Sequence, residues 1–154
     1  MTVEGVLRIP LRRFEDERGW FSELRRDSAL PKRMVQTNVV FSRKGVIRGL
    51  HFHERGQDDL FIALEGTARI VVMDRETGAT FTEDIGDDNP VAIYVPGHHA
   101  HGYEALTDVV FCYHVTEEYD PDDPDEHGIP WNDGRVAHLW STTTPILSGR
   151  DAAP

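Results

Sequence analysis

The chain has 154 residues, one cysteine and a formal net charge of −11 at pH 7. This length suffices for one domain, residues 1–154, whose core needs neither disulfides nor a structural metal. The negative charge argues against nucleic-acid and membrane surfaces, which require clustered Lys and Arg, and with no signal peptide or membrane-spanning apolar run we expect a cytoplasmic protein.

Short β-branched and aromatic runs recur along the chain, separated by Gly, Pro, Asp or Asn. In chain order we expect strands at Val6–Ile9, Trp20–Leu24, Val35–Phe41, Val46–Phe52, Leu60–Leu64, Ala68–Met73, Thr80–Asp84, Val91–Val95 and Val109–Val115. Their spacing predicts an all-β sandwich, jelly roll or barrel. One helical turn is expected near Ser28–Lys32, because Pro31 limits its length. The acidic run Pro121–His127 is typical of a solvated loop.

Histidines gather in two places. His51 and His53 come at the end of one predicted strand, and a second cluster comprises His98, His99 and His101. Because residues two apart in a strand share a face, we expect His51 and His53 both to face the interior. A lone histidine there would most simply be structural, but two clusters in one short chain indicate a functional site.

Tyr113 lies in an apolar strand, where the simplest role is a core residue with its hydroxyl at the barrel mouth. If Tyr113 faces inward, Phe111 and Val115 do so too, while Cys112 and His114 face the other side. The apolar neighbours of Cys112 predict a buried small hydrophobic residue rather than a reactive thiol.

Five motifs occur together over nearly the whole chain. They are FEDERGWFSE (Phe14–Glu23), QTNVVFSRKGVIRGLHF (Gln36–Phe52), the VPGHHAHGYEAL segment, YHVTEEYDP with GIPWND (Tyr113–Asp133), and PILSGRDAAP at the carboxyl end. In order and spacing this set resembles the dTDP-4-dehydrorhamnose 3,5-epimerase family. The resemblance implies a cupin jelly roll with few short helices.

The resemblance also implies catalytic roles. In that family a histidine removes the proton next to a ketone, and a tyrosine on the opposite face returns one. By motif, His51 of RGLH would be the base and Tyr113 the acid. Asp151 would orient and charge the base, and His101 would lie near the reacting ketone.

A nucleotide-sugar site and a homodimer follow from the same resemblance. The substrate would be a dTDP-4-keto-6-deoxyhexose, epimerised at C3 or at C3 and C5, with no cofactor. An amino-terminal strand would add to the partner's sheet. Arginines suit a diphosphate because guanidinium donates paired hydrogen bonds. The implied substrate contacts are Arg18, Phe21, Glu23, Gln36, Asn38, Arg48, Tyr119 and Arg150.

Two departures from the family pattern lie beside the expected base. The family usually has a glutamine where this chain has His53. It also has a lysine for the enolate oxygen where counting back from Gly66 places Asp59. A carboxylate there would repel a developing enolate, which requires a positive or donor group.

Both departures create potential metal ligands. The pattern from Gly45 through Gly66 is similar to that of metal-binding cupins, and the alternative ligand set for one divalent ion is His51, His53, Asp59 and His101. Zinc, nickel, iron and manganese all accept such ligands. The alternative functions are therefore a metal-dependent isomerase, cyclase or dioxygenase, and a non-catalytic nucleotide-sugar-binding homologue.

Overall fold

The structure, a computed structural model that describes residues 2–154, has two five-stranded antiparallel sheets. The first has the order β1-β9-β6-β11-β4 and the second β12-β5-β10-β7-β8. The strands are β1 (Leu7–Pro10), β4 (Gln36–Ser42), β5 (Ile47–Phe52), β6 (Asp58–Glu65), β7 (Thr67–Met73), β8 (Thr80–Gly86), β9 (Val91–Pro96), β10 (Ala100–Ala105), β11 (Val109–Val115) and β12 (His127–Gly128). A separate hairpin joins β2 (Phe14–Asp16) and β3 (Gly19–Phe21).

Alternation along β6 and β11 explains how the two sheets form a barrel. Phe61 and Phe111 belong to the apolar core between the sheets. Leu60, Ile62 and Cys112 point the other way, into a second cluster beneath the amino-terminal segment. The first sheet is thus covered on both faces, and the expected cupin jelly roll is confirmed.

Most expected strands appear within two residues of their predicted ends, but one is shorter and three were missed. The expected strand Trp20–Leu24 is wrong after Phe21, where β3 ends. The strands β2, β10 and β12 were not expected. Sequence patterns miss β10 because its sequence AHGYEA is poor in β-branched residues. In the second sheet it nevertheless lies between β5 and β7.

The helices are short. The turn expected near Ser28–Lys32 is a 3-10 helix, η1 (Asp27–Ala29), which begins one residue earlier. A second 3-10 helix is η2 (Ala137–Leu139). A four-residue helix, α1 (Gly149–Ala152), was not expected. None of the described helices is long and apolar enough to cross a membrane.

Two glycines allow β5 and β10 to approach closely. A Cβ on Gly102 would lie 2.4 Å from the Arg48 carbonyl oxygen, and one on Gly49 would lie 2.9 Å from the Gly102 Cα. Gly49 also has a φ of +144°, which side-chain-bearing residues rarely adopt. The register shifts here between His101 and Tyr103, while His101 still pairs directly with His51.

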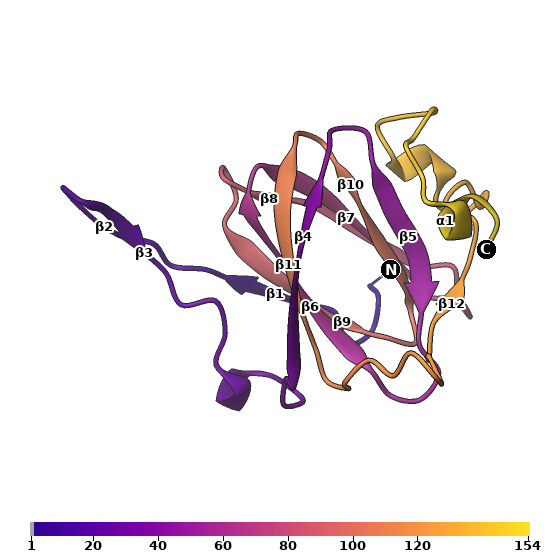
Figure 1. The fold of residues 1–154 in the computed structure, drawn as a ribbon, viewed down its shortest axis with the longest axis horizontal. Coiled ribbons are helices and arrows are strands. Elements are labelled where there is room, and N and C mark those ends of the chain that lie inside the picture. The colour runs from indigo at the N-terminus through magenta and orange to yellow at the C-terminus, as the bar shows by residue number, and fades with distance from the viewer. Residues whose placement is uncertain (1) are drawn as a thin grey trace.

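The two ends of the chain lie differently against the barrel. Figure 1 shows the β2–β3 hairpin extending away from it, whereas the carboxyl-terminal segment folds back and places α1 beside β5. That segment is anchored by Trp140 and Val136, which pack on Leu50 in a third apolar cluster. It also forms a bridge between Ile146 and Val46. This packing brings residue 151 to the barrel mouth.

Candidate active site

A cavity of about 470 Å³ opens between the two sheets and the carboxyl-terminal segment. This volume is in the usual range for small-molecule sites. Its ionisable and phenolic lining residues are Arg48, His51, His53, Asp59, His101, Tyr103, Tyr113, Glu126, Arg150 and Asp151. All four residues expected to be catalytic therefore line one cavity.

His51 at the end of β5 is held by a carboxylate from the far end of the chain. Its Nε2 lies 2.6 Å from Oδ1 of Asp151 on α1. Oδ2 of the same carboxylate accepts the Gly49 backbone N–H at 3.3 Å, and the Ser148 hydroxyl caps α1 by accepting the Asp151 N–H. Because a carboxylate accepts, Nε2 carries the proton and Nδ1 keeps the lone pair.

Asp151 remains ionised in this arrangement. Burial raises the pKa of its carboxyl, but the hydrogen bonds from His51 and the Gly49 N–H outweigh this, so the pKa lies below its ordinary value. An ionised carboxylate stabilises the imidazolium that forms when His51 takes a proton. The pair is thus arranged as a general base.

Tyr113 reaches the cavity from β11, in the opposite sheet to His51. Phe111 shares its inward direction, while Cys112 and His114 point outward, as the alternation predicted. Burial raises the pKa of the Tyr113 phenol, and the charge of Asp59 raises it further. The phenol therefore stays protonated near neutral pH and is able to donate.

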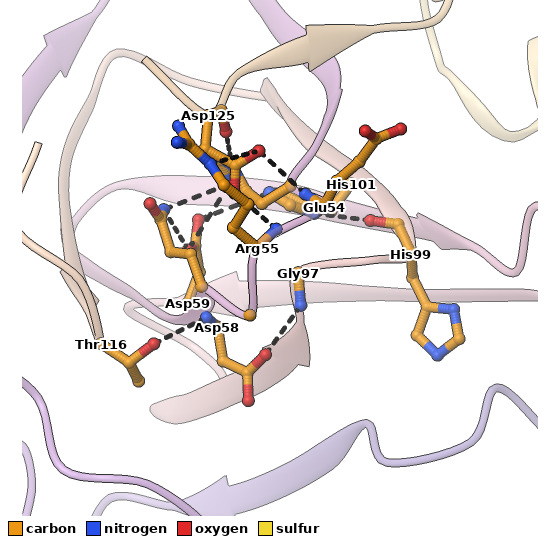
Figure 2. A network of polar contacts seen from close by, with 12 residues as sticks. Glu54, Arg55, Asp58, Asp59, Gly97, His99, His101, Thr116 and Asp125 are labelled. Carbon is orange, nitrogen blue, oxygen red and sulfur yellow. Dashed lines mark hydrogen bonds and ion pairs between the residues drawn. The ribbon is translucent and has the colours of Figure 1, made fainter. Parts of the chain in front are cut away.

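A second histidine and carboxylate cluster lies deeper in the cavity. His101 Nε2 is 3.4 Å from Oδ2 of Asp59, and His53 Nε2 is 3.8 Å from Oδ1. Figure 2 shows Asp59 below Glu54 and Asp125, and the hydrogen bond between the His101 ring and the backbone carbonyl of His99. Burial raises the pKa of Asp59, but the two imidazoles lower it more, and the result is below its ordinary value.

The residues proposed for the metal alternative are only partly brought together. Ligand atoms of His53, Asp59 and His101 all lie within 4.8 Å of one another. His51 is not in this group, and its Nε2 is bound to Asp151. The four-residue set expected from the sequence is therefore a set of three.

The expected substrate contacts divide between the cavity and the surface. Arg48 and Arg150 line the cavity; Arg48 donates to Ser42 at 2.9 Å and Arg150 pairs with Glu126. Tyr119 lines a neighbouring acidic cavity of about 280 Å³.

The other expected contacts lie outside the cavity lining. Gln36 and Asn38 are partly buried on the edge strand β4 and hydrogen-bond to each other. Arg18 and Phe21 are exposed on the β2–β3 hairpin, and Glu23 follows it. Arg18 pairs there with Asp16, and Glu23 with Arg26. The structure therefore leaves these three residues away from the cavity of their own chain.

Sequence reasoning missed three residues that organise the cavity. Gln57 donates to Asp59 Oδ1 at 2.9 Å, and Glu126 pairs with Arg150. The carboxylate of Asp125 accepts the backbone N–H groups of Glu54 and Arg55 (Figure 2). The run Pro121–His127 is thus only partly a solvated loop. Of the three missed residues, only Gln57 had a sequence signal, because it lies two residues before Asp59.

Comparisons with known proteins show the family of this chain. The family model described as dTDP-4-dehydrorhamnose 3,5-epimerase matches residues 1–154. The dTDP-4-dehydrorhamnose 3,5-epimerase of Escherichia coli K12 is 37% identical, with 97% of this chain and 88% of that protein covered. The spore coat polysaccharide biosynthesis protein SpsL of Bacillus subtilis 168 is also 37% identical, covering 91% and 97%.

The fold of this chain is also similar to that of a solved structure. The Legionella pneumophila Philadelphia 1 enzyme RmlC, in complex with dTDP-4-keto-L-rhamnose, superposes with a TM-score of 0.87 at 28% identity. The match covers 99% of this chain and 88% of that one. With the paired His51 and Asp151 facing Tyr113 across the cavity, this chain belongs to the dTDP-4-dehydrorhamnose 3,5-epimerase family.

Proposed function

We propose that this protein epimerises a dTDP-4-keto-6-deoxyhexose at one or both carbons beside the ketone. The observation that carries the proposal is the His51–Asp151 pair, 2.6 Å apart, opposite Tyr113 on the other sheet. Support also comes from the whole-length family match and from the Legionella relative, whose structure holds a dTDP-4-keto sugar.

The chemistry consists of two proton transfers on opposite faces of the sugar. His51 Nδ1 takes the proton from the carbon beside the carbonyl, and the C–H electron pair becomes part of an enolate. Asp151 stabilises the imidazolium formed. The Tyr113 phenol returns a proton from the other face, which inverts the carbon. Both groups are side chains, so the transfers themselves use no cofactor.

The anionic diphosphate requires local positive charge on a protein of net charge −11. Arg48 and Arg150 supply it at the cavity. Guanidinium groups suit phosphate because they donate paired hydrogen bonds and remain charged.

A homodimer would bring further contacts to each site. The β2–β3 hairpin exposes Trp20 and Phe21, and the edge strand β4 exposes Val39 and Phe41, with 52, 64, 66 and 54% of their surfaces accessible. An edge strand with exposed apolar side chains is a surface for strand pairing. We therefore place Arg18, Phe21 and Glu23 at the site of the second copy.

Mixing two inactive variants tests this shared site. If the hairpin acts in trans, His51→Ala and Arg18→Ala chains, unfolded and refolded together, form mixed dimers with one intact site. Random mixing then restores about a quarter of wild-type activity, because half of the dimers are mixed. No recovery, or a monomer by light scattering, would contradict a site shared between copies.

A cytoplasmic location stays a prediction, which cell fractionation checks.

Incubation with dTDP-4-keto-6-deoxyglucose in heavy water, followed by NMR, tests the activity. We expect deuterium at one or both carbons flanking the ketone, and the positions labelled show how many carbons are epimerised. The alternative of a non-catalytic binding protein predicts thermal stabilisation by dTDP without any deuterium in the sugar. That result would overturn the proposal.

A further inference from the structure

The proposed proton transfers leave one buried cluster of the cavity without a role. His53 follows β5, Asp59 belongs to β6 and His101 to β10. Their side chains are buried, with at most 4% of each residue accessible, yet all three line the same cavity as His51. Two imidazoles and one carboxylate thus meet from both sheets, with ligand atoms within 4.8 Å of one another.

The orientation of the two rings is fixed by backbone carbonyls. Nδ1 of His53 lies 2.6 Å from the Asp125 carbonyl oxygen, and Nδ1 of His101 lies 2.8 Å from that of His99. A carbonyl only accepts, so each Nδ1 carries a proton and donates it. In the neutral rings both Nε2 atoms therefore have lone pairs directed at Asp59. Such carbonyl-bound imidazoles are the usual arrangement of histidines that bind a metal.

The Nε2 atoms of His53 and His101 and the carboxylate of Asp59 are three acceptors that converge on one point, where the Gln57 amide is the donor. The Gln57 amide donates to Asp59 Oδ1 at 2.9 Å and lies 3.2 Å from His53 Nε2. Oδ2 lies 3.4 Å from His101 Nε2. Within residues 2–154, the Asp59 carboxylate lies within 4 Å of these two imidazoles and is paired with no lysine or arginine. Converging buried acceptors of this kind need a shared positive charge, which either a metal cation or a proton on one imidazole supplies.

We propose that His53, Asp59 and His101 bind one divalent transition-metal ion inside the cavity, beside the base His51. Imidazole and carboxylate ligands suit zinc, iron, manganese or nickel. Its catalytic role, which rests on the proposed function, is to supply positive charge for the enolate oxygen; the binding of the ion does not rest on it. The separation of this cluster from the His51–Asp151 pair leaves the base free.

Metal binding is measured directly, without reference to activity. Untagged full-length protein is dialysed against Zn²⁺, Mn²⁺, Ni²⁺ or Co²⁺, passed through a desalting column and analysed for bound metal. We expect about one ion per chain for at least one metal, d–d absorption bands of bound Co²⁺, and a melting temperature that a chelator lowers.

Matched variants assign the ligands. Asp59→Asn and His101→Gln should each lose most of the bound ion, as should His53→Gln. His51→Asn, which lies two residues before His53 and outside the cluster, should keep the bound ion. The surface variant His138→Asn should keep it too. Circular dichroism identifies any variant that fails to fold, and the remaining ligand variants then decide the result.

Two readouts separate this inference from the epimerase function. Deuterium entry into the keto sugar at an unchanged rate in chelator-treated, metal-free protein would overturn the catalytic role of the ion and leave the epimerase standing. Stoichiometric metal binding without deuterium entry would leave the metal site standing and overturn the epimerase function, and with it the catalytic role of the ion. Less than about a tenth of an ion per chain for every metal would overturn the site and indicate a protonated histidine beside Asp59 instead.

Discussion

Two groups of histidine and carboxylate share one cavity but differ in which ring nitrogen is occupied. In the first, Asp151 accepts from Nε2 of His51 at 2.6 Å. In the second, backbone carbonyls accept from Nδ1 of His53 and His101, and both Nε2 atoms face Asp59. The first arrangement prepares a base with a carboxylate behind it. The second directs lone pairs to one point, which suits a cation. The partner of the second nitrogen thus decides the role of each ring.

The largest effect is expected from changing the partner of the base. Asp151→Asn keeps an oxygen for the Gly49 N–H, but its amide N–H also donates to His51 Nε2 and shifts the ring proton to Nδ1. Nδ1 then cannot accept. We predict that turnover falls by about 10²- to 10⁴-fold, measured by NMR at saturating sugar nucleotide.

The matched control is Asp133→Asn, which removes a carboxylate from a surface pair with Arg135. It should retain wild-type turnover. Equal losses in both variants, or wild-type turnover in Asp151→Asn, would show that the Asp151 carboxylate does not set the state of His51.

A smaller effect is expected from removing the opposite phenol. Tyr113→Phe leaves the His51–Asp151 pair intact, so proton removal continues while return from the other face is lost. We predict that inverted product falls by about 10²-fold while deuterium still enters the sugar. One NMR time course measures both the inverted product and the deuterium in the sugar.

Tyr94→Phe is the control for this prediction. It removes a phenol that bonds to Asp58 on the outer face of the same sheet, so stability should fall but inversion should not. Parallel loss of exchange and inversion in Tyr113→Phe would contradict the division of labour between the two sheets.

The smallest effect concerns a fourth histidine, which is held by Arg25 and Thr37 rather than by a carboxylate. His114 lies next to Tyr113 but points outward, and its Nδ1 accepts from Arg25 at 3.0 Å. Burial lowers the pKa of His114, the Arg25 charge lowers it further, and Asp27 opposes them. The unfolded chain therefore binds more protons, so stability is lost as the pH falls through the ordinary histidine pKa of 6.5 towards the lower folded value.

His114→Asn, which retains an acceptor oxygen, should flatten this part of the stability profile. Urea unfolding between pH 7.5 and pH 5 measures the change, at roughly constant m-value. The exposed His138→Asn variant should keep the wild-type slope. An unchanged slope in His114→Asn would mean that another group titrates.

Part of the cavity lining could be predicted from the sequence alone. Alternation predicted that His51 and His53 face the interior together and that Phe111 shares the direction of Tyr113, because residues two apart in a strand lie on the same face. It did not decide whether Tyr113 itself faces inward. Asp151 came only from the resemblance, because it lies 100 residues beyond His51 and reaches it through packing of the carboxyl-terminal segment.

Other parts of the site depend on tertiary structure that no local pattern records. Gln57 and Glu126 enter the cavity from turns whose paths are set by the barrel. The proton positions on His53 and His101 follow from two backbone carbonyls, one of them in the acidic loop. The strand β10 was missed because its sequence AHGYEA contains no β-branched residue, while its Gly102 allows a close approach to β5 that no strand propensity records.

Whether His51 is the base is decided by the rate of deuterium entry into dTDP-4-keto-6-deoxyglucose, compared between wild type and His51→Asn. Binding of dTDP to both proteins, measured by calorimetry, confirms intact sites. We predict rapid exchange in the wild type and a fall of at least about 10³-fold in the variant. Exchange at the wild-type rate in His51→Asn would contradict the assignment of His51 as the base.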